Sequence, residues 1–214
     1  MKKPVVAVVT ALLLATTVAA CGRTEMSAPV TATDAVVSTN LPPVETSPDV
    51  MKVISGDTVF VKEFSEMAGR ANNYEIAAAT IAEQKAQDPA LKAYAREMIK
   101  DHGAMALEMN NKAVLAGPQF TIPVTLDSKH QAMIDQLNAA SGSQFDMLYV
   151  SQMRQSHKDT YELLNAFSDR GNESNFQEMA QDNKQTVYDH MVEIDKIASG
   201  MMSAHGNMSG TSSM

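Results

Sequence analysis

The sequence lacks most of the residues that cross-link small domains or mark common catalytic sites. Its 214 residues include one cysteine and no tryptophan, so no intramolecular disulfide can hold the fold together. After the first twenty residues, no stretch approaches the ~20 apolar residues that a membrane-spanning helix needs. No phosphate-binding loop, nucleophile elbow or zinc-protease motif occurs. We therefore expect a packed domain outside the bilayer, for which binding is favoured over catalysis.

Positive charge is also scarce. The chain has 17 Lys and Arg residues against 25 Asp and Glu residues, a net charge of −8. The acidic residues are spread along the chain and do not form one block. An acidic surface of this kind argues against nucleic acid as a partner and favours simple solubility.

The N-terminus predicts an export signal. Lys2 and Lys3 precede the apolar run "VVAVVTALLLATTVAA", and Cys21 follows directly. The end of this run, "VAAC", resembles a bacterial lipobox, in which the chain is cut before the cysteine and the cysteine is lipidated. The alternative is an ordinary secretory signal cut near Ala20. We expect lipidated Cys21 to tether the protein to the membrane, and Gly22 favours the outer membrane, with the protein facing the periplasm.

Composition divides the mature chain into three parts. Residues 21–56 hold four of the eight prolines and show no helical or alternating period, which predicts a lipid-anchored flexible linker. Residues 57–199 carry continuous helical periodicity and form the predicted domain. Residues 200–214, rich in Met, Gly and Ser, predict a disordered tail. Met201, Met202, His205 and Met208 make this tail a weaker candidate for copper binding.

The domain predicts an all-α fold. Four long amphipathic stretches are separated by "QDPAL", a loop with Pro118 and Pro123, and "DRGNES". Asp57 is the expected cap of the first helix. A short extra helix is expected near residues 127–139, between the second and third long helices. Short connections within each pair favour an antiparallel four-helix bundle.

Each long helix has one ionisable residue in or beside its apolar stripe: Glu75, His102, His157 and His190. Measured from their shared turn, Glu75 and His102 lie nearly level. The distances of His157 and His190 from the turn between their helices differ by five residues, or ~7 Å. Side chains lean toward the N-terminus of their own helix, and this lean reduces the difference. One carboxylate and three imidazoles near the middle of a bundle are a suitable ligand set for Zn, Cu or Fe.

Each of these four residues also has a structural interpretation. A buried imidazole can be satisfied by one carboxylate and one carbonyl, so the four could serve only to hold the helices in register. Asp101 could orient the His102 ring or be solvated. Asp146 follows the S-x-x-D pattern, so it could complete a capping box with Ser143 or act with the histidines. These alternatives stay open at the level of sequence.

Several segments carry a resemblance to a known family. They are "FVKEFSEMAGRANNYEIAAATIAEQKAQDPALKAYAREMIKDH", "LDSKHQAMIDQLNAASGSQFDMLYVSQMRQSH" and "VYDHMVEIDKIA". Together they resemble an uncharacterised bacterial family of exported ferritin-like proteins, many described only as outer-membrane proteins. Its recurring features match Glu75, the Met98-Asp101-His102 motif, the Phe145-Asp146-Tyr149 motif, His157 and His190. The resemblance implies a ferritin-like fold and an envelope location, and the family has no agreed activity. Asp101, Asp146 and Tyr149 become candidates for supporting the ligands.

The sequence departs from better-known metal-binding bundles. Ferritin-like di-iron proteins carry Glu-x-x-His twice, but Ile99, Arg154 and Val187 stand three residues before the histidines. We therefore disfavour di-iron and oxygen chemistry. The preferred function is an envelope-tethered ferritin-like lipoprotein with a transition-metal site in its core. The alternative is a structural or stress-related envelope protein whose buried Glu and His only fix helix packing.

Overall fold

The computed structural model describes residues 41–208, with side chains up to Ser203. The predicted signal peptide, the lipidation of Cys21 and the first half of the linker lie outside the described residues, as does the chain from residue 209. In the described part the secondary structure consists of six helices and one isolated bridge, between Val59 and Gly171. None of these helices is long and apolar enough to span a membrane. The predicted all-α class is confirmed.

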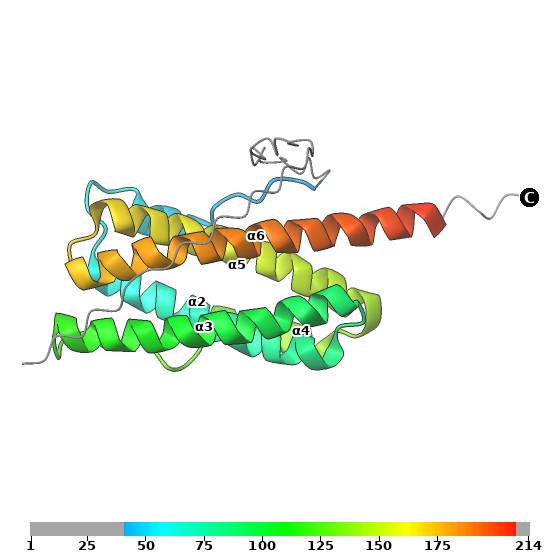
Figure 1. Cartoon of the computed structure of the whole chain (residues 1–214), viewed down its shortest axis with the longest axis horizontal. Helices are drawn as coiled ribbons and strands as arrows, with labels where there is room; N and C mark the ends of the chain where they lie inside the picture. The colour runs from blue at the N-terminus through cyan, green and yellow to red at the C-terminus, as the bar shows by residue number, and fades with distance from the viewer. Residues whose placement is uncertain (1–40, 209–214) are drawn as a thin grey trace, which may run out of the picture. The chain divides into compact units, whose positions relative to one another are not determined.

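The helices follow the chain in the order α1 (Pro48–Ile54), α2 (Val61–Lys85), α3 (Pro89–Ala116), α4 (Ser128–Ala139), α5 (Gly142–Arg170) and α6 (Ser174–Met208). Turns of residues 86–88 and 171–173 join α2 to α3 and α5 to α6 as antiparallel hairpins. The contacts of α2 with α5 and of α3 with α6 complete a four-helix bundle whose neighbouring helices run antiparallel (Figure 1). This confirms the predicted antiparallel bundle.

The connection between the two hairpins sets up this arrangement. Residues 117–127 lead from the end of α3 to α4, so that α5 begins beside the α2–α3 turn (Figure 1). The connection packs closely on α2, where Asn73 donates a hydrogen bond to the Pro123 carbonyl (2.6 Å). A Cβ at Gly69 would lie 2.7 Å from the Ile122 side chain, so this close approach requires glycine. The predicted short helix is α4.

The bundle core has two apolar halves. One half is lined by Ala78, Met98, Phe145, Met153, Ile194 and others. The other half contains Phe64, Met105, Leu163, Phe167, Val187 and others. On α3, α5 and α6 a buried histidine stands between the members of the two halves, and on α2 the buried Glu75 lies next to Tyr74, the first α2 member of one half. The polar residues therefore form one layer across the middle of the bundle.

Side-chain caps explain where α3 and α4 begin. The Asp88 carboxylate accepts a hydrogen bond from the Ala90 amide, and Pro89 occupies the first turn of α3. The Asp127 carboxylate accepts from the His130 amide at the start of α4. The expected cap at Asp57 is wrong. Helix α2 begins at Val61, whose amide instead donates to the Asn172 side chain (2.7 Å).

The prediction of a flexible linker needs correction over residues 41–56. This segment contains α1 and lies along the bundle, where α1 packs against α5. The Ser47 amide donates to the Asp159 carboxylate (2.7 Å), and Arg154 donates to the Pro42 carbonyl (2.9 Å). Val50 is buried. Partners on α5 satisfy the segment's backbone, so it is ordered without an apolar period of its own.

The tail prediction also needs correction at its start. Helix α6 continues past residue 199 to Met208. Glycine at position 200 costs only about 1 kcal/mol of helix stability relative to alanine. Met201 packs against the apolar half that contains Ile194. The helical backbone therefore extends nine residues into the predicted tail.

Candidate metal centre

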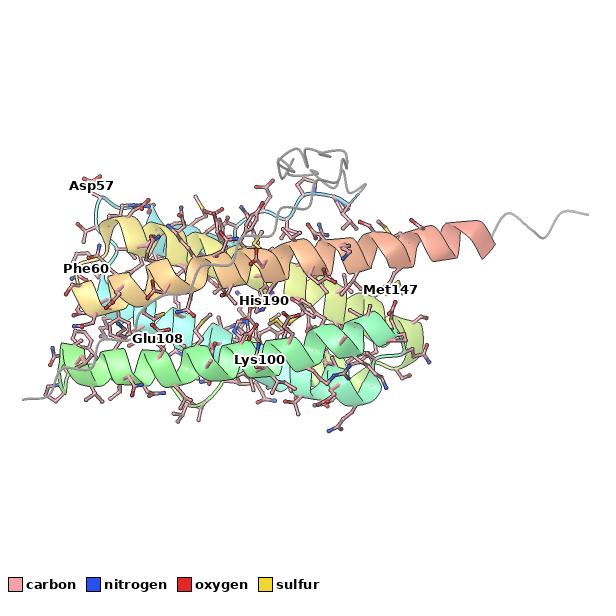
Figure 2. All side chains as sticks on the ribbon, in the orientation of Figure 1. Asp57, Phe60, Lys100, Glu108, Met147 and His190 are labelled. Atoms are coloured by element: carbon pink, nitrogen blue, oxygen red, sulfur yellow. The ribbon has the colours of Figure 1, made fainter. Side chains whose placement is uncertain are left out.

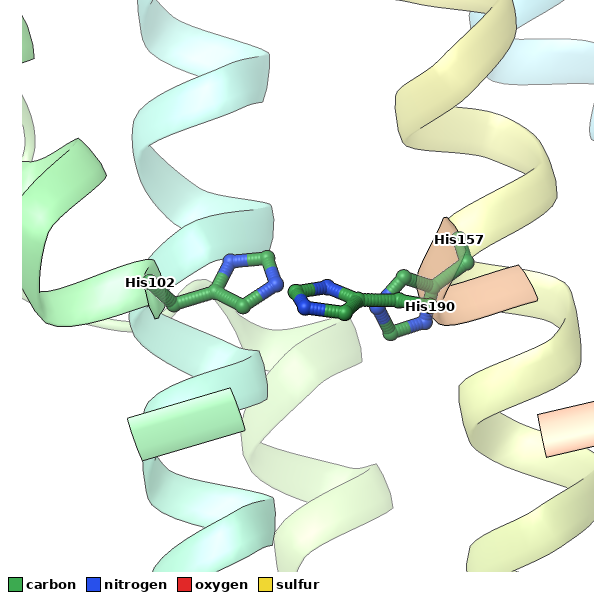
Figure 3. Close-up of side chains that lie close together, drawn as sticks. All are labelled: His102, His157 and His190. Carbon is green, nitrogen blue, oxygen red and sulfur yellow. The ribbon is translucent and has the colours of Figure 1, made fainter. Parts of the chain in front are cut away.

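The polar layer brings the four predicted residues together. Glu75, His102, His157 and His190 come from α2, α3, α5 and α6, and all four are buried. The ring centroids of the three histidines are 5.3–5.6 Å apart. Figure 3 shows the three rings directed toward one another from their separate helices. Bundle packing thus removes most of the offset that the turn lengths imply for His157 and His190.

His102 is hydrogen-bonded to Asn72 and lies beside Glu75, both on α2. Its Nδ1 lies 2.9 Å from Asn72 Oδ1 and 3.1 Å from Glu75 Oε2. The Asn72 side chain also donates through Nδ2 to the His102 carbonyl, so its Oδ1 acts as the acceptor. The His102 proton therefore sits on Nδ1, which leaves a lone pair on Nε2.

His157 and His190 are fixed in the same way by different acceptors. His157 Nδ1 donates to the Met153 carbonyl one turn earlier in α5 (2.8 Å). His190 Nε2 donates to Asp101 Oδ2 across the contact between α3 and α6 (3.2 Å). A carbonyl or carboxylate oxygen can only accept, so each bond assigns the tautomer. The lone pairs fall on His157 Nε2 and His190 Nδ1.

The three lone-pair nitrogens have no hydrogen-bond partner among the described residues. His102 Nε2, His157 Nε2 and His190 Nδ1 are all buried and unsatisfied, and so is Glu75 Oε2. One ring nitrogen from each histidine lies within 4.8 Å of one from each of the others. Buried polar atoms are rarely left without a partner. In metal-binding histidines one ring nitrogen binds the ion, and the other donates its proton to a carboxylate or carbonyl oxygen. The three histidines show this arrangement.

The electrostatic environment keeps the three histidines neutral. Burial lowers the pKa of His102 well below its usual value, and the neighbouring His157 and His190 lower it further. Burial lowers the pKa of His157 to about 4, against the opposing hydrogen bond to the Met153 carbonyl. The pKa of His190 is also lowered, first by burial. Neutral imidazole is the form that binds a metal.

Glu75 lies beside the histidine triad. Its Oε1 accepts a hydrogen bond from the Ser156 hydroxyl (2.5 Å) and lies 3.9 Å from His157 Nδ1. Burial raises the pKa of Glu75 to about 7, although the Ser156 hydrogen bond and His190 both oppose the rise. The group whose ligand atoms lie mutually within 4.8 Å contains the three histidines without Glu75. Its role as a fourth ligand therefore stays a prediction.

The three supporting candidates have different positions. Asp101 contacts the triad at His190, whose Nε2 donates to its carboxylate. It does not orient the His102 ring, which was one of the two expectations. Asp146 accepts from the Gln87 amide (3.0 Å) and the Asp88 amide (3.0 Å), so it ties α5 to the turn before α3. It therefore belongs neither to a capping box nor to the histidine cluster. Tyr149 is fully buried, and its hydroxyl has no partner among the described residues.

Sequence reasoning missed three residues near the centre. Asn72 orients His102, and Ser156 holds Glu75. The Tyr94 ring centroid lies 6.2 Å from those of His157 and His190. The signal for Asn72 was available, because a residue three before Glu75 shares its helix face. Ser156 and Tyr94 give no such signal, since their contacts depend on how the helices pack.

No curated protein and no solved structure matches this chain. One family match covers most of its length. Residues 56–197, which include the whole polar layer, match the family described as a domain of unknown function (DUF4142). The chain therefore belongs to the DUF4142 family, and the histidine triad lies inside the family's domain.

Proposed function

We propose that this protein binds a transition-metal ion through His102, His157 and His190, with Glu75 as a fourth ligand. The observation that carries the proposal is the set of three buried ring nitrogens without partners, each opposite a nitrogen that donates to a fixed oxygen. Three imidazoles and a carboxylate suit Zn²⁺, Cu or Fe ions. The neutral histidines allow binding without proton release from the triad.

The proposal extends to the type of bundle and to its cellular location. A single long connection between two antiparallel hairpins supports a ferritin-like arrangement. The signal-like residues 1–20 and the lone Cys21 support a lipid anchor, which would place the domain in the bacterial envelope, at the outer membrane and facing the periplasm. The membrane would then be reached through the lipid on Cys21.

Metal analysis of matched histidine variants tests the proposal. The full chain is purified in detergent and incubated with Zn²⁺, Cu²⁺ or Fe²⁺, and its metal content is measured after desalting. We expect about one ion per chain, lost in His157→Gln and retained in His130→Gln. His130 is a suitable control because it lies on α4 and pairs with Asp127, outside the triad. Retention of the metal in His157→Gln, or no metal in the wild type, contradicts the proposal.

The competing function is a polar layer that only fixes helix register. It is favoured by the hydrogen bonds that join different helices through the layer, between Asn72 and His102 and between Ser156 and Glu75. Chelation separates the two functions, because a ligand bound only to the folded state raises stability by mass action. A metal centre predicts a lower melting temperature after treatment with a chelator. A register layer predicts no change.

A further inference from the structure

A second group of potential ligands adjoins the triad on its outer side. Glu97, Asp101 and His190 each offer a ligand atom, and these atoms lie within 4.8 Å of one another. Glu97 is exposed, Asp101 is partly exposed, and His190 is buried. The group therefore joins solvent to the polar layer through a residue that both groups share. We call Glu97, Asp101 and His190 the outer site.

His190 can serve only one of the two groups at a time. Its Nε2 faces Asp101 at 3.2 Å, and its Nδ1 is the nitrogen without a partner among the described residues. A neutral imidazole has one lone pair. With the proton on Nε2, the lone pair is on Nδ1. His190 therefore faces the triad with its lone pair and the outer site with its N–H.

We propose that the outer site captures a divalent cation from solvent and transfers it to the histidine triad. This inference rests on the proposed function. In the captured state the ion is held by the Glu97 and Asp101 carboxylates, beside His190. In the transferred state it binds the His190 Nδ1 lone pair together with His102 and His157, and the proton on Nε2 stays in place. Exposed carboxylates bind weakly and exchange quickly, whereas buried imidazoles retain the ion.

The charges at the outer site suit an incoming cation. Glu97 forms no hydrogen bond or ion pair among the described residues, although the pKa of Lys100 is raised by the hydrogen bond and charge of Asp101 and by the charge of Glu97. Asp101 pairs with Lys100 Nζ at 2.9 Å, but the Lys100 side chain is 80% exposed. Such a surface pair contributes little to stability, so an arriving cation can replace it. Figure 2 shows Lys100 on α3 and His190 on the neighbouring helix α6.

The other approach to the layer suits a cation less well. A cavity of about 110 Å³ between α1, α2, α4 and α5 reaches Ser156, whose hydroxyl holds Glu75. Arg70 and Lys129 line this cavity. Of its carboxylates, Asp159 accepts from the Ser47 amide, Asp127 pairs with His130, and Asp49 forms an exposed pair with Lys129. Glu97 of the outer site differs, because it forms neither a hydrogen bond nor an ion pair among the described residues.

Loading kinetics with Co²⁺ test this proposal on the full chain. The visible absorption of Co²⁺ reports binding to the triad in a stopped-flow experiment, and EDTA then reports release. We expect Glu97→Gln to slow loading at least threefold and to slow release by the same factor. The dissociation constant and the final stoichiometry stay unchanged, because a residue that acts only on the route alters both directions equally.

Glu63→Gln is the matched control. Glu63 is an exposed glutamate in the first turn of α2, so the two variants lose the same charge. Equal loading rates in the two variants would overturn the outer site and leave the proposed function intact. A weaker dissociation constant in Glu97→Gln with unchanged loading would make Glu97 a ligand of the final site and overturn the transfer. A wild-type chain that binds neither Co²⁺ nor any of the ions in the metal analysis would overturn both proposals.

Discussion

Each triad histidine uses one ring nitrogen to donate to a fixed oxygen and leaves the other unsatisfied inside the bundle. A histidine kept only for packing gains nothing from this arrangement, since an unsatisfied buried acceptor costs about 1–3 kcal/mol. Asn72, the Met153 carbonyl and Asp101 come from different helices, yet they produce the same outcome at His102, His157 and His190. At the scale of single residues, the layer is built to present lone pairs.

The lowered pKa values of the histidines predict acid sensitivity of the metal-free protein. Between pH 6.5 and about 4 the unfolded chain protonates His157, whereas the folded chain does not. The unfolded chain then binds more protons, so the free energy of unfolding rises as the pH increases from about 4 to 6.5. His102 and His190 act in the same direction. We expect a rise of about 2 kcal/mol or more in urea titrations with EDTA present.

Glu75 acts in the opposite direction and provides the control. Its pKa is raised to about 7, so between pH 4.5 and 7 the folded chain holds a proton that the unfolded chain has lost. This contribution is present at low pH and is lost as the pH rises to about 7. Glu75→Gln should therefore steepen the rise, and His157→Gln should reduce it. Stability that is flat or falls from pH 4 to 6.5 would contradict the assignment of neutral buried histidines.

At the scale of helices, one carboxylate joins the two hairpins at the end of the bundle where α3 and α5 begin. Asp146 is buried on α5, and its oxygens accept from two backbone amides just before α3. Those amides belong to the turn that joins α2 and α3. The contact therefore supports the antiparallel packing of α5 against α2 at a point far along the bundle from the bridge between Val59 and Gly171.

Removal of this carboxylate should reduce stability without affecting the proposed metal site. We expect Asp146→Ala to lower the free energy of unfolding by about 1–3 kcal/mol, because two amides lose their acceptor. Urea unfolding measures this change, and metal analysis should show unchanged content. Asp135→Ala, an exposed position on α4, should change stability little. Loss of metal in Asp146→Ala would instead connect Asp146 to the histidines.

At the scale of the whole molecule, the described domain would be held to a membrane only through the N-terminal lipid. Residues 41–56 lie along α5. If Cys21 carries the lipid, this segment belongs to the domain and not to the spacer between the domain and the anchor.

The anchor can be tested by fractionation of cells that express the full chain. Cys21→Ala should move the protein from the membrane fraction to the soluble periplasmic fraction, because the lipid is the proposed anchor and none of the described helices can span a bilayer. Gly22→Asp retains the cysteine and should leave the protein in the membrane fraction, with a shift toward the inner membrane. A Cys21→Ala protein that stays with the membrane would disprove lipid anchoring at this position.

The sequence by itself determined the helices and the four polar positions within them. Helical period and Pro89 act over a few residues, so they can be read locally. The caps were not read correctly, since Asp57 was expected and the structure shows Asp88 and Asp127. Glu75, His102, His157 and His190 were identifiable because each interrupts an apolar stripe. Glu75 and His102 were expected at the same height in the bundle, because they lie at nearly equal distances from the short turn between α2 and α3.

Only the tertiary structure decided which atoms meet. The lone pairs converge because neighbouring helices pack at a particular rotation, which turn lengths do not specify. Asp101 reaches His190, and Asp146 reaches the α2–α3 turn, over separations of 89 and 58–59 residues. Residues 41–56 are ordered by acceptors and donors on α5 and not by a pattern of their own. Local periodicity contains no information on such partners, because their contacts form only when the whole bundle has packed.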